Sequence, residues 1–285
     1  MSMAIDQSGS PAVVAPKIGN PVLYVAAAGF ALWSLGWIVL IPEHASRLGW
    51  TLEVVGPLLI AAAIIMFVSS LVARLGMAVV VFAAAGAIVG ALSTIFFAID
   101  PKNLSTTNGV RFGYGAYAAG LLLGAIAFAL VLLRKETELS NAENREYPPC
   151  GIGCPCGNII HSSFASIALS GVGLLVWGIG FIVHTVHPQG TSLGWVLSVV
   201  GALLLTVGIA VHTPHLAARF GTNMVSIGLL SVVVWLVGYL LNVIKPNAAP
   251  TDSWYTYLFL CYAIGHLLSA VSVMLVVRRK ATMRA

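Results

Sequence analysis

The sequence predicts an all-α, polytopic membrane protein whose eight transmembrane helices form two tandem four-helix repeats in the same orientation. Three observations predict this fold class: the composition, the spacing of the charged residues, and a duplication of the chain. Of the 285 residues, 59% are hydrophobic and only 8% are charged, and the mean hydropathy is +0.97. Soluble domains carry about 25% charged residues, so this composition indicates a chain surrounded by lipid.

The charged residues leave windows long enough to cross a bilayer, which takes about 20 apolar residues in a helix. Six such windows lie between Lys17 and Glu43, Glu53 and Arg74, Arg74 and Asp100, Arg111 and Arg134, Arg219 and Lys245, and Asp252 and Arg278. The stretch from Tyr147 to Ala218 has no Asp, Glu, Lys or Arg. A polar break from His187 to Ser192 divides it into two further spans, which brings the expected total to eight.

The basic residues predict the orientation. Ten of the fourteen Lys and Arg lie on the side of the two termini, and four lie on the other side: Arg47, Lys102, Arg111 and Lys245. Because cytoplasmic loops carry the excess of basic residues, we expect a multi-pass protein of the cell membrane with both termini in the cytoplasm. The first residues have no basic cluster, so we expect no cleaved signal peptide.

A duplication relates the two halves of the chain. The segment from Leu48 to Trp50 recurs from Leu193 to Trp195, an offset of 145 residues, and the first helix aligns at 144. A repeat of four spans is even, so both halves have the same orientation. The expected units are a disordered cytoplasmic N-terminus (1–20), repeat 1 (21–133), a cytoplasmic Cys-containing linker (134–162), repeat 2 (163–280) and a C-terminal tail (281–285).

Small and aromatic residues predict how the spans pack. Two GxxxG motifs, one at Gly86 and Gly90 and one at Gly120 and Gly124, are interpreted as internal packing surfaces rather than as a dimer interface. Four aromatic residues at the outer boundary are expected to be anchors at the membrane surface: Trp50, Trp195, Trp254 and Tyr255.

Histidine distinguishes the second half from the first. His184 aligns with Leu40, and His266, near the middle of the last span, aligns with Leu121. Five histidines lie in or beside spans of the second half: His184, His187, His212, His215 and His266. Ionisable groups inside membranes mark ion and substrate pathways, so these five predict a path for a transition metal ion. The alternative interpretation is that the rings near helix ends favour the interface and that His266 bonds to a hydroxyl or carbonyl.

The linker carries a candidate metal site on the cytoplasmic side. Cys150, Cys154 and Cys156, with His161 five residues later, supply three thiolates and one imidazole. That set binds zinc and also suits other soft-site metals such as copper, whereas a cytoplasmic location disfavours a structural disulfide. The alternative is that these are palmitoylated or reactive thiols near the membrane.

Haem is the lesser cofactor hypothesis. His212 and His266 lie at different depths, which argues against their binding one b-type haem together, although Met274 offers another ligand. None of the nine carboxylates is expected mid-span, which disfavours a proton-coupled symporter unless His266 is the relay. Pro57 lies inside a predicted span.

The function expected from the sequence is that of a permease or channel-like protein for a small solute or a transition metal ion. The alternatives are a non-catalytic accessory subunit of a larger membrane complex and a haem-binding membrane redox protein. An enzyme is not favoured, because the chain has no Walker, GxSxG, HExxH or dinucleotide motif. The expected surroundings are the bilayer and a homo-oligomer or another membrane protein, and not nucleic acid.

Overall fold

The computed structural model describes residues 20–102, 106–143, 155–187, 192–213, 216–217, 221–245 and 253–282. These residues are helical apart from short turns, and they contain eight helical segments long and apolar enough to span a membrane. The predicted all-α fold with eight spans is therefore confirmed. The chain is a multi-pass membrane protein.

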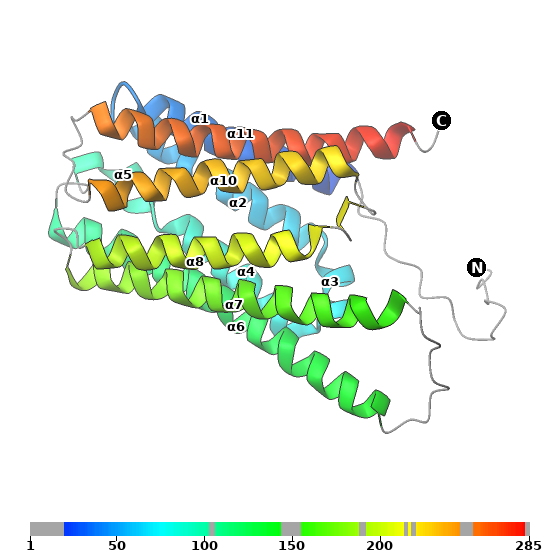
Figure 1. Ribbon diagram of the computed structural model, residues 1–285. Coiled ribbons are helices and arrows are strands. Elements are labelled where there is room, and N and C mark those ends of the chain that lie inside the picture. The colour runs from blue at the N-terminus through cyan, green and yellow to red at the C-terminus, as the bar shows by residue number, and fades with distance from the viewer. Residues whose placement is uncertain are drawn as a thin grey trace.

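Figure 1 shows the helices in their order along the chain. The eight spans are α1 (Asn20–Leu40), α2 (Arg47–Met66), α4 (Met77–Leu92) with its short extension α5 (Ile95–Ile99), α6 (Thr107–Glu143), α7 (Pro155–Val186), α8 (Ser192–Val211), α10 (Thr222–Ile244) and α11 (Ser253–Thr282). A further helix, α3 (Val68–Leu75), links α2 to α4. Both ends of the predicted linker 134–162 are helical, because α6 continues to Glu143 and α7 begins at Pro155.

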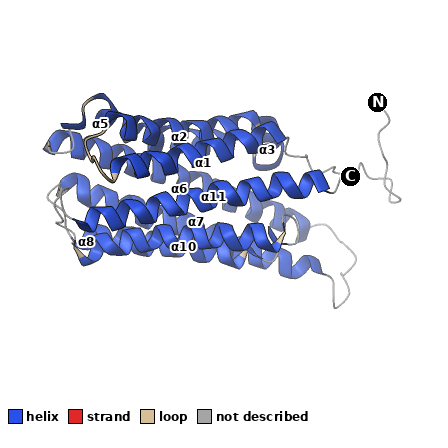
Figure 2. Ribbon diagram, turned by 90° about the horizontal axis from the view of Figure 1, so that it is seen from above, coloured by secondary structure: helices blue, strands red, loops and turns tan. Residues whose placement is uncertain are grey.

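The spans form a closed ring in which each helix packs against two neighbours. Its order is α1, α2, α4, α6, α7, α8, α10 and α11, and α11 closes the ring against α1. The junctions α2/α4 and α8/α10 are less extensive than the other six. The helices lie roughly parallel and antiparallel to one another in both views (Figures 1 and 2). We call the end at which α1 begins and α11 ends the terminal end, and the other the opposite end.

Equivalent glycine contacts occur in the two halves. A Cβ on Gly29 of α1 would lie 2.8 Å from the carbonyl oxygen of Gly56 in α2, and a Cβ on Gly173 of α7 would lie 2.7 Å from that of Gly201 in α8. These positions are related by the offsets of the sequence duplication. The relation of the two halves by an axis along the membrane normal stays a prediction.

A second equivalent pair lies at the terminal end. Gly76 before α4 and Gly221 before α10 have φ angles of 86° and 101°, a conformation that a side chain strains. A Cβ on Gly76 would meet the guanidinium group of Arg134, and a Cβ on Gly221 would meet that of Arg279. The two turns therefore have the same conformation and the same neighbouring cation.

The two GxxxG motifs pack against each other. A Cβ on Gly86 of α4 would lie 2.7 Å from the carbonyl oxygen of Gly120 in α6, and one on Gly120 would lie 2.8 Å from that of Gly86. Their interpretation as internal packing surfaces is confirmed. The close approach suits lipid, where association depends on packing because the solvent is as apolar as the helices.

Two of the expected surface anchors lie inside the ring, which corrects that prediction. The Trp50 side chain is only 5% exposed, and its Nε1 donates a hydrogen bond of 2.9 Å to the carbonyl oxygen of His44. The Trp195 ring lies 4.2 Å from the His184 ring, centroid to centroid. Sequence position predicts the depth of such a residue, but not whether it faces lipid or the neighbouring helices.

We predict that Gly86→Ala destabilises the protein by about 1–3 kcal/mol, because the methyl group forces α4 away from α6. The matched control is Gly90→Ala in the same motif, since a Cβ there meets nothing within 4 Å among the described residues. Thermal unfolding in detergent measures both. Equal loss of stability in the two variants would contradict this account of the α4/α6 contact.

Candidate functional site

The histidines predicted to line one path lie in different surroundings. His184 is 1% exposed, whereas His187, three residues later, is exposed. His212 is half-buried just beyond the end of α8, and His215 lies outside the described residues. His266 is 7% exposed and lies near the middle of α11. Two of the five, His184 and His266, are therefore buried in the bundle.

The candidate metal site of the linker is outside the part of the chain that the structure describes in full. Cys150 and Cys154 fall in the undescribed stretch 144–154, and Cys156 and His161 lie in α7 without described side chains. Among the described residues, no three His, Cys, Asp or Glu side chains come together in a group that could hold a metal ion. Metal binding by the cysteines stays a prediction.

Glu53 is the functional candidate that the sequence reasoning missed. It marks the boundary of a predicted span, but α2 begins at Arg47, so Glu53 lies roughly 9 Å along the helix. Its side chain is only 2% exposed. Glu53 therefore lies within the span rather than at its boundary, because the helix starts nearly two turns earlier, where Ser46 caps it by accepting a hydrogen bond from Gly49 N.

The Glu53 carboxyl group lies between α2 and α1. Trp33 Nε1 donates a hydrogen bond of 2.7 Å to Glu53 Oε2, while Oε1 has no hydrogen-bond partner within the described part of the chain. A Cβ on Gly36 would lie 2.6 Å from Oε1. The absent side chain of Gly36 therefore makes the space that the carboxyl group occupies.

Trp33 also contacts His266. The two rings stack with their centroids 3.9 Å apart and their planes 16° from parallel. His266 Nε2 has no hydrogen-bond partner in the described residues, so the expected hydroxyl or carbonyl partner is not found for that nitrogen. Trp33 thus bonds to Glu53 by its edge and stacks on His266 by its face. We call Glu53, Trp33 and His266 the Glu53 site.

Pro57 changes the backbone next to this site. In a regular helix the N–H of residue 57 would donate to the carbonyl oxygen of residue 53, but proline has no N–H to give. The chain accommodates Pro57 within α2. Glu53 therefore offers a second acceptor, its own carbonyl oxygen, which lacks the usual bond from residue 57.

The equivalent positions in the trio of α6, α7 and α8 have the same packing and lack these ionisable groups. The geometry is the same, since a Cβ on Gly180 would lie 2.6 Å from Ser198 Oγ just as one on Gly36 would from Glu53. At the duplication offsets, Trp177 matches Trp33, Ser198 matches Glu53, Ala202 matches Pro57 and Leu121 matches His266. A helix trio of this kind therefore packs without a carboxylate or an imidazole, so the fold does not require them.

His184 occupies a separate position towards the opposite end. Its ring lies 5.2 Å from that of Tyr114 as well as beside Trp195, and its Nε2 has no hydrogen-bond partner among the residues described. Trp195, Tyr239, Trp235 and His266 form a chain of ring contacts, with successive centroid distances of 6.2, 4.7 and 6.4 Å. Aromatic rings thus connect the two buried histidines.

His44 lies outside the spans, in the turn between α1 and α2 at the opposite end. Its ring packs against those of Tyr255 and Phe259, at centroid distances of 5.8 and 5.2 Å. Burial lowers the pKa of the His44 imidazole, because the protein shields it from water. This cluster lies at the opposite end of the helix bundle, next to Trp37, whose ring also packs against Phe259.

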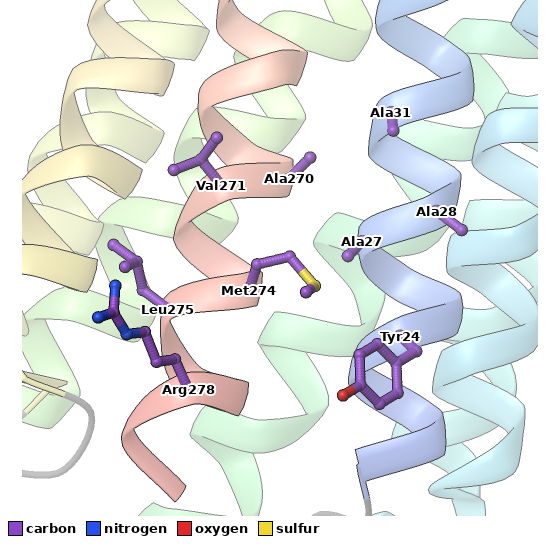
Figure 3. Close-up of a pocket in the computed structure, with 9 residues that line it drawn as sticks. All are labelled: Tyr24, Ala27, Ala28, Ala31, Ala270, Val271, Met274, Leu275 and Arg278. Carbon is purple, nitrogen blue, oxygen red and sulfur yellow. The ribbon is translucent and has the colours of Figure 1, made fainter. Parts of the chain in front are cut away.

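A surface cavity of about 560 Å³ lies between α1 and α11, away from the Glu53 site (Figure 3). It is lined by apolar side chains, with Arg278 at one end: Tyr24, Ala27, Ala28, Ala31, Ala270, Val271, Met274 and Leu275. The Met274 side chain points across this cavity towards α1 (Figure 3). It therefore does not join His266 inside the ring as the second haem ligand that the sequence suggested.

We predict that Trp33→Phe and Glu53→Ser couple by about 1–3 kcal/mol in a double-mutant cycle of thermal stability, because either change alone removes the buried hydrogen bond. The control cycle pairs Trp33→Phe with Glu43→Ser, since Glu43 is an exposed glutamate at the same end. Its coupling should be close to zero. A Glu53 coupling as small as that of Glu43 would contradict the bond.

Comparisons of this chain with protein-family models, with curated proteins and with solved structures find no match. The functional conclusion therefore rests on the chemistry of the buried groups. Two features bear on it: a buried carboxyl group within α2, one oxygen of which has no hydrogen-bond partner among the described residues, and an imidazole joined to it through one tryptophan.

Proposed function

We propose that this chain is a permease of the cell membrane that carries a small solute, and that the Glu53 site is its intramembrane ionisable site. The supporting observation is the burial of Glu53 and His266 around Trp33, with an unpartnered polar atom on each within the described structure. Ionisable groups at such depth are costly and usually serve ion or substrate pathways. Because the equivalent trio of α6, α7 and α8 packs without them, a structural role does not explain them.

Glu53 supplies the feature whose absence argued against a proton-linked carrier. A carboxyl group inside a span can bind a proton on one side of the membrane and release it on the other. The interior histidines favour a small solute over a transition metal ion. Each of them has aromatic neighbours, and neither belongs to a group of three His, Cys, Asp or Glu side chains that could hold a metal ion among the described residues.

The interior of the ring has to open for a solute to pass. The aromatic side chains inside the ring of helices lie in contact with one another. The ring centroids of Trp37 and Tyr262 are 4.9 Å apart, and those of Tyr117 and Phe181 are 4.6 Å apart. The less extensive junctions, α2/α4 and α8/α10, are where the helices separate with the least loss of contact. α2 carries Glu53, so opening at α2/α4 moves the ionisable site itself.

We predict that Glu53→Gln lowers solute flux at least tenfold, because glutamine keeps the shape of the side chain and cannot exchange a proton. The measurement uses purified protein in liposomes with an imposed pH gradient, a pH-sensitive dye inside, and a panel of cationic, anionic and neutral small solutes. His266→Leu, which copies Leu121 at the equivalent position of the first half, should also slow the flux.

Glu43→Gln is the control, and it should transport as the wild type does, because the Glu43 side chain is exposed. Two results would overturn the proposal. One is that no member of the panel crosses with the wild-type protein. The other is that Glu53→Gln carries every transported solute at the wild-type rate.

A further inference from the structure

We infer that the Glu53 site exchanges a proton for a small ammonium-type monovalent cation, so that the carried solute is positively charged. This inference rests on the proposed permease function and specifies its substrate class. Three features of the site support it: the absence of a buried Lys or Arg among the described residues, the Oε1 atom of Glu53 that has no partner among them, and the aromatic rings towards the opposite end.

No buried Lys or Arg side chain accompanies Glu53 in the described interior. Among the residues whose side chains are described, the buried ionisable groups other than tyrosine are Glu53, His184 and His266, and no Lys or Arg is buried with them. The protein therefore brings no fixed cation of its own to Glu53. A lone carboxylate in a water-free interior is very costly, so the site holds either a proton or a cation from outside.

Oε1 of Glu53 is the oxygen that accepts the cation. Oε1 has no hydrogen-bond partner in the described structure, and Trp33 holds Oε2 in place, so the carboxyl group is oriented before any ligand arrives. The backbone carbonyl oxygen of the same residue lacks the usual bond from Pro57. Carboxyl groups and carbonyls freed from a helix are the groups with which membrane carriers coordinate cations.

The rings nearby favour an ammonium-type cation. Trp37 lies one turn beyond Trp33 on α1 and packs against Phe259 and Tyr262 of α11. Together with Trp50 and the half-buried His44, these rings form an aromatic cluster at the opposite end of the bundle. Aromatic faces attract ammonium groups and replace part of their hydration.

The exchange step conserves charge. With the site open to one side, the cation enters, the O–H bond of the protonated Glu53 carboxyl group breaks, and the proton leaves to the water on that side. The carboxylate then pairs with the cation. On the other side the reverse step releases the cation and takes up a proton, so one positive charge moves in each direction and no electrons are transferred.

Proton release from purified, full-length protein in detergent and weak buffer tests this inference. Methylammonium chloride is added with a pH indicator present, tetramethylammonium chloride is the larger probe, and sodium chloride controls for ionic strength. We expect saturable release approaching one proton per chain. Because proton and cation compete for one carboxyl group, the apparent affinity should fall up to about tenfold for each unit of decreasing pH at which the group is protonated.

The variants identify the group that releases the proton. Glu53→Gln should release at least tenfold less than the wild type, and Glu53→Ser, which copies Ser198, gives the same test should the glutamine variant fold poorly. Glu43→Gln should behave as the wild type does. Pro57→Ala should bind methylammonium more weakly but still release a proton, because it restores the helix bond to the Glu53 carbonyl.

The inference is overturned if neither ammonium salt releases protons from the wild type, or if both Glu53 variants release as many as it does. These outcomes separate from the failure of the permease proposal. Glu53-dependent flux of a neutral or anionic solute, without proton release by cations, would support the permease function and contradict the cation as its solute. Proton release at Glu53 with no flux in liposomes would keep the exchange site and remove the permease.

Discussion

The close approach of α1 and α2 is the constraint on which this structure depends. In lipid, helices associate through packing contacts rather than through exclusion of water. Glycines therefore stabilise the contact between two helices, because they let the backbones approach more closely than larger residues do. Gly29 lies against Gly56, and Gly36 against Gly49 and Glu53. The same approach brings Trp33 within hydrogen-bond distance of Glu53 and gives the carboxyl group its space over Gly36. The same glycine contacts therefore pack α1 against α2 and form the Glu53 site, and replacing one of these glycines with a larger residue would disturb both.

The two halves of the chain share glycine contacts and differ in their ionisable groups. Equivalent glycine contacts join α1 to α2 and α7 to α8, and equivalent turns precede α4 and α10. On this background Glu53 and His266 belong to the trio of α1, α2 and α11, and His184 belongs to that of α6, α7 and α8. Smaller or apolar residues occupy the equivalent positions in the trio of α6, α7 and α8, so packing at these positions does not require Glu53 or His266.

The aromatic interior relates the site to the movement that a carrier needs. Rings make broad contacts that separate and re-form without leaving polar backbone groups exposed to hydrocarbon, so they suit an interface that opens. The junctions between α2 and α4 and between α8 and α10 are the less extensive ones, and each divides two pairs of more closely packed helices. A movement there leaves the α1/α2 contact intact. The hydrogen bond between Trp33 and Glu53 then travels with one rigid pair.

The sequence by itself determined the membrane environment, the number of spans, the internal role of the GxxxG motifs and the contrast between the halves in histidine, because charge, apolar length and spacing are written along the chain. Only the tertiary structure decided that Glu53 lies inside a span, that Trp50 and Trp195 face inward, and that Met274 faces outward. A linear pattern measures depth along a helix but not the direction in which each side chain points. A buried carboxyl group is tolerated because Trp33, on another helix, donates to it, and that partnership exists only once α1 lies against α2.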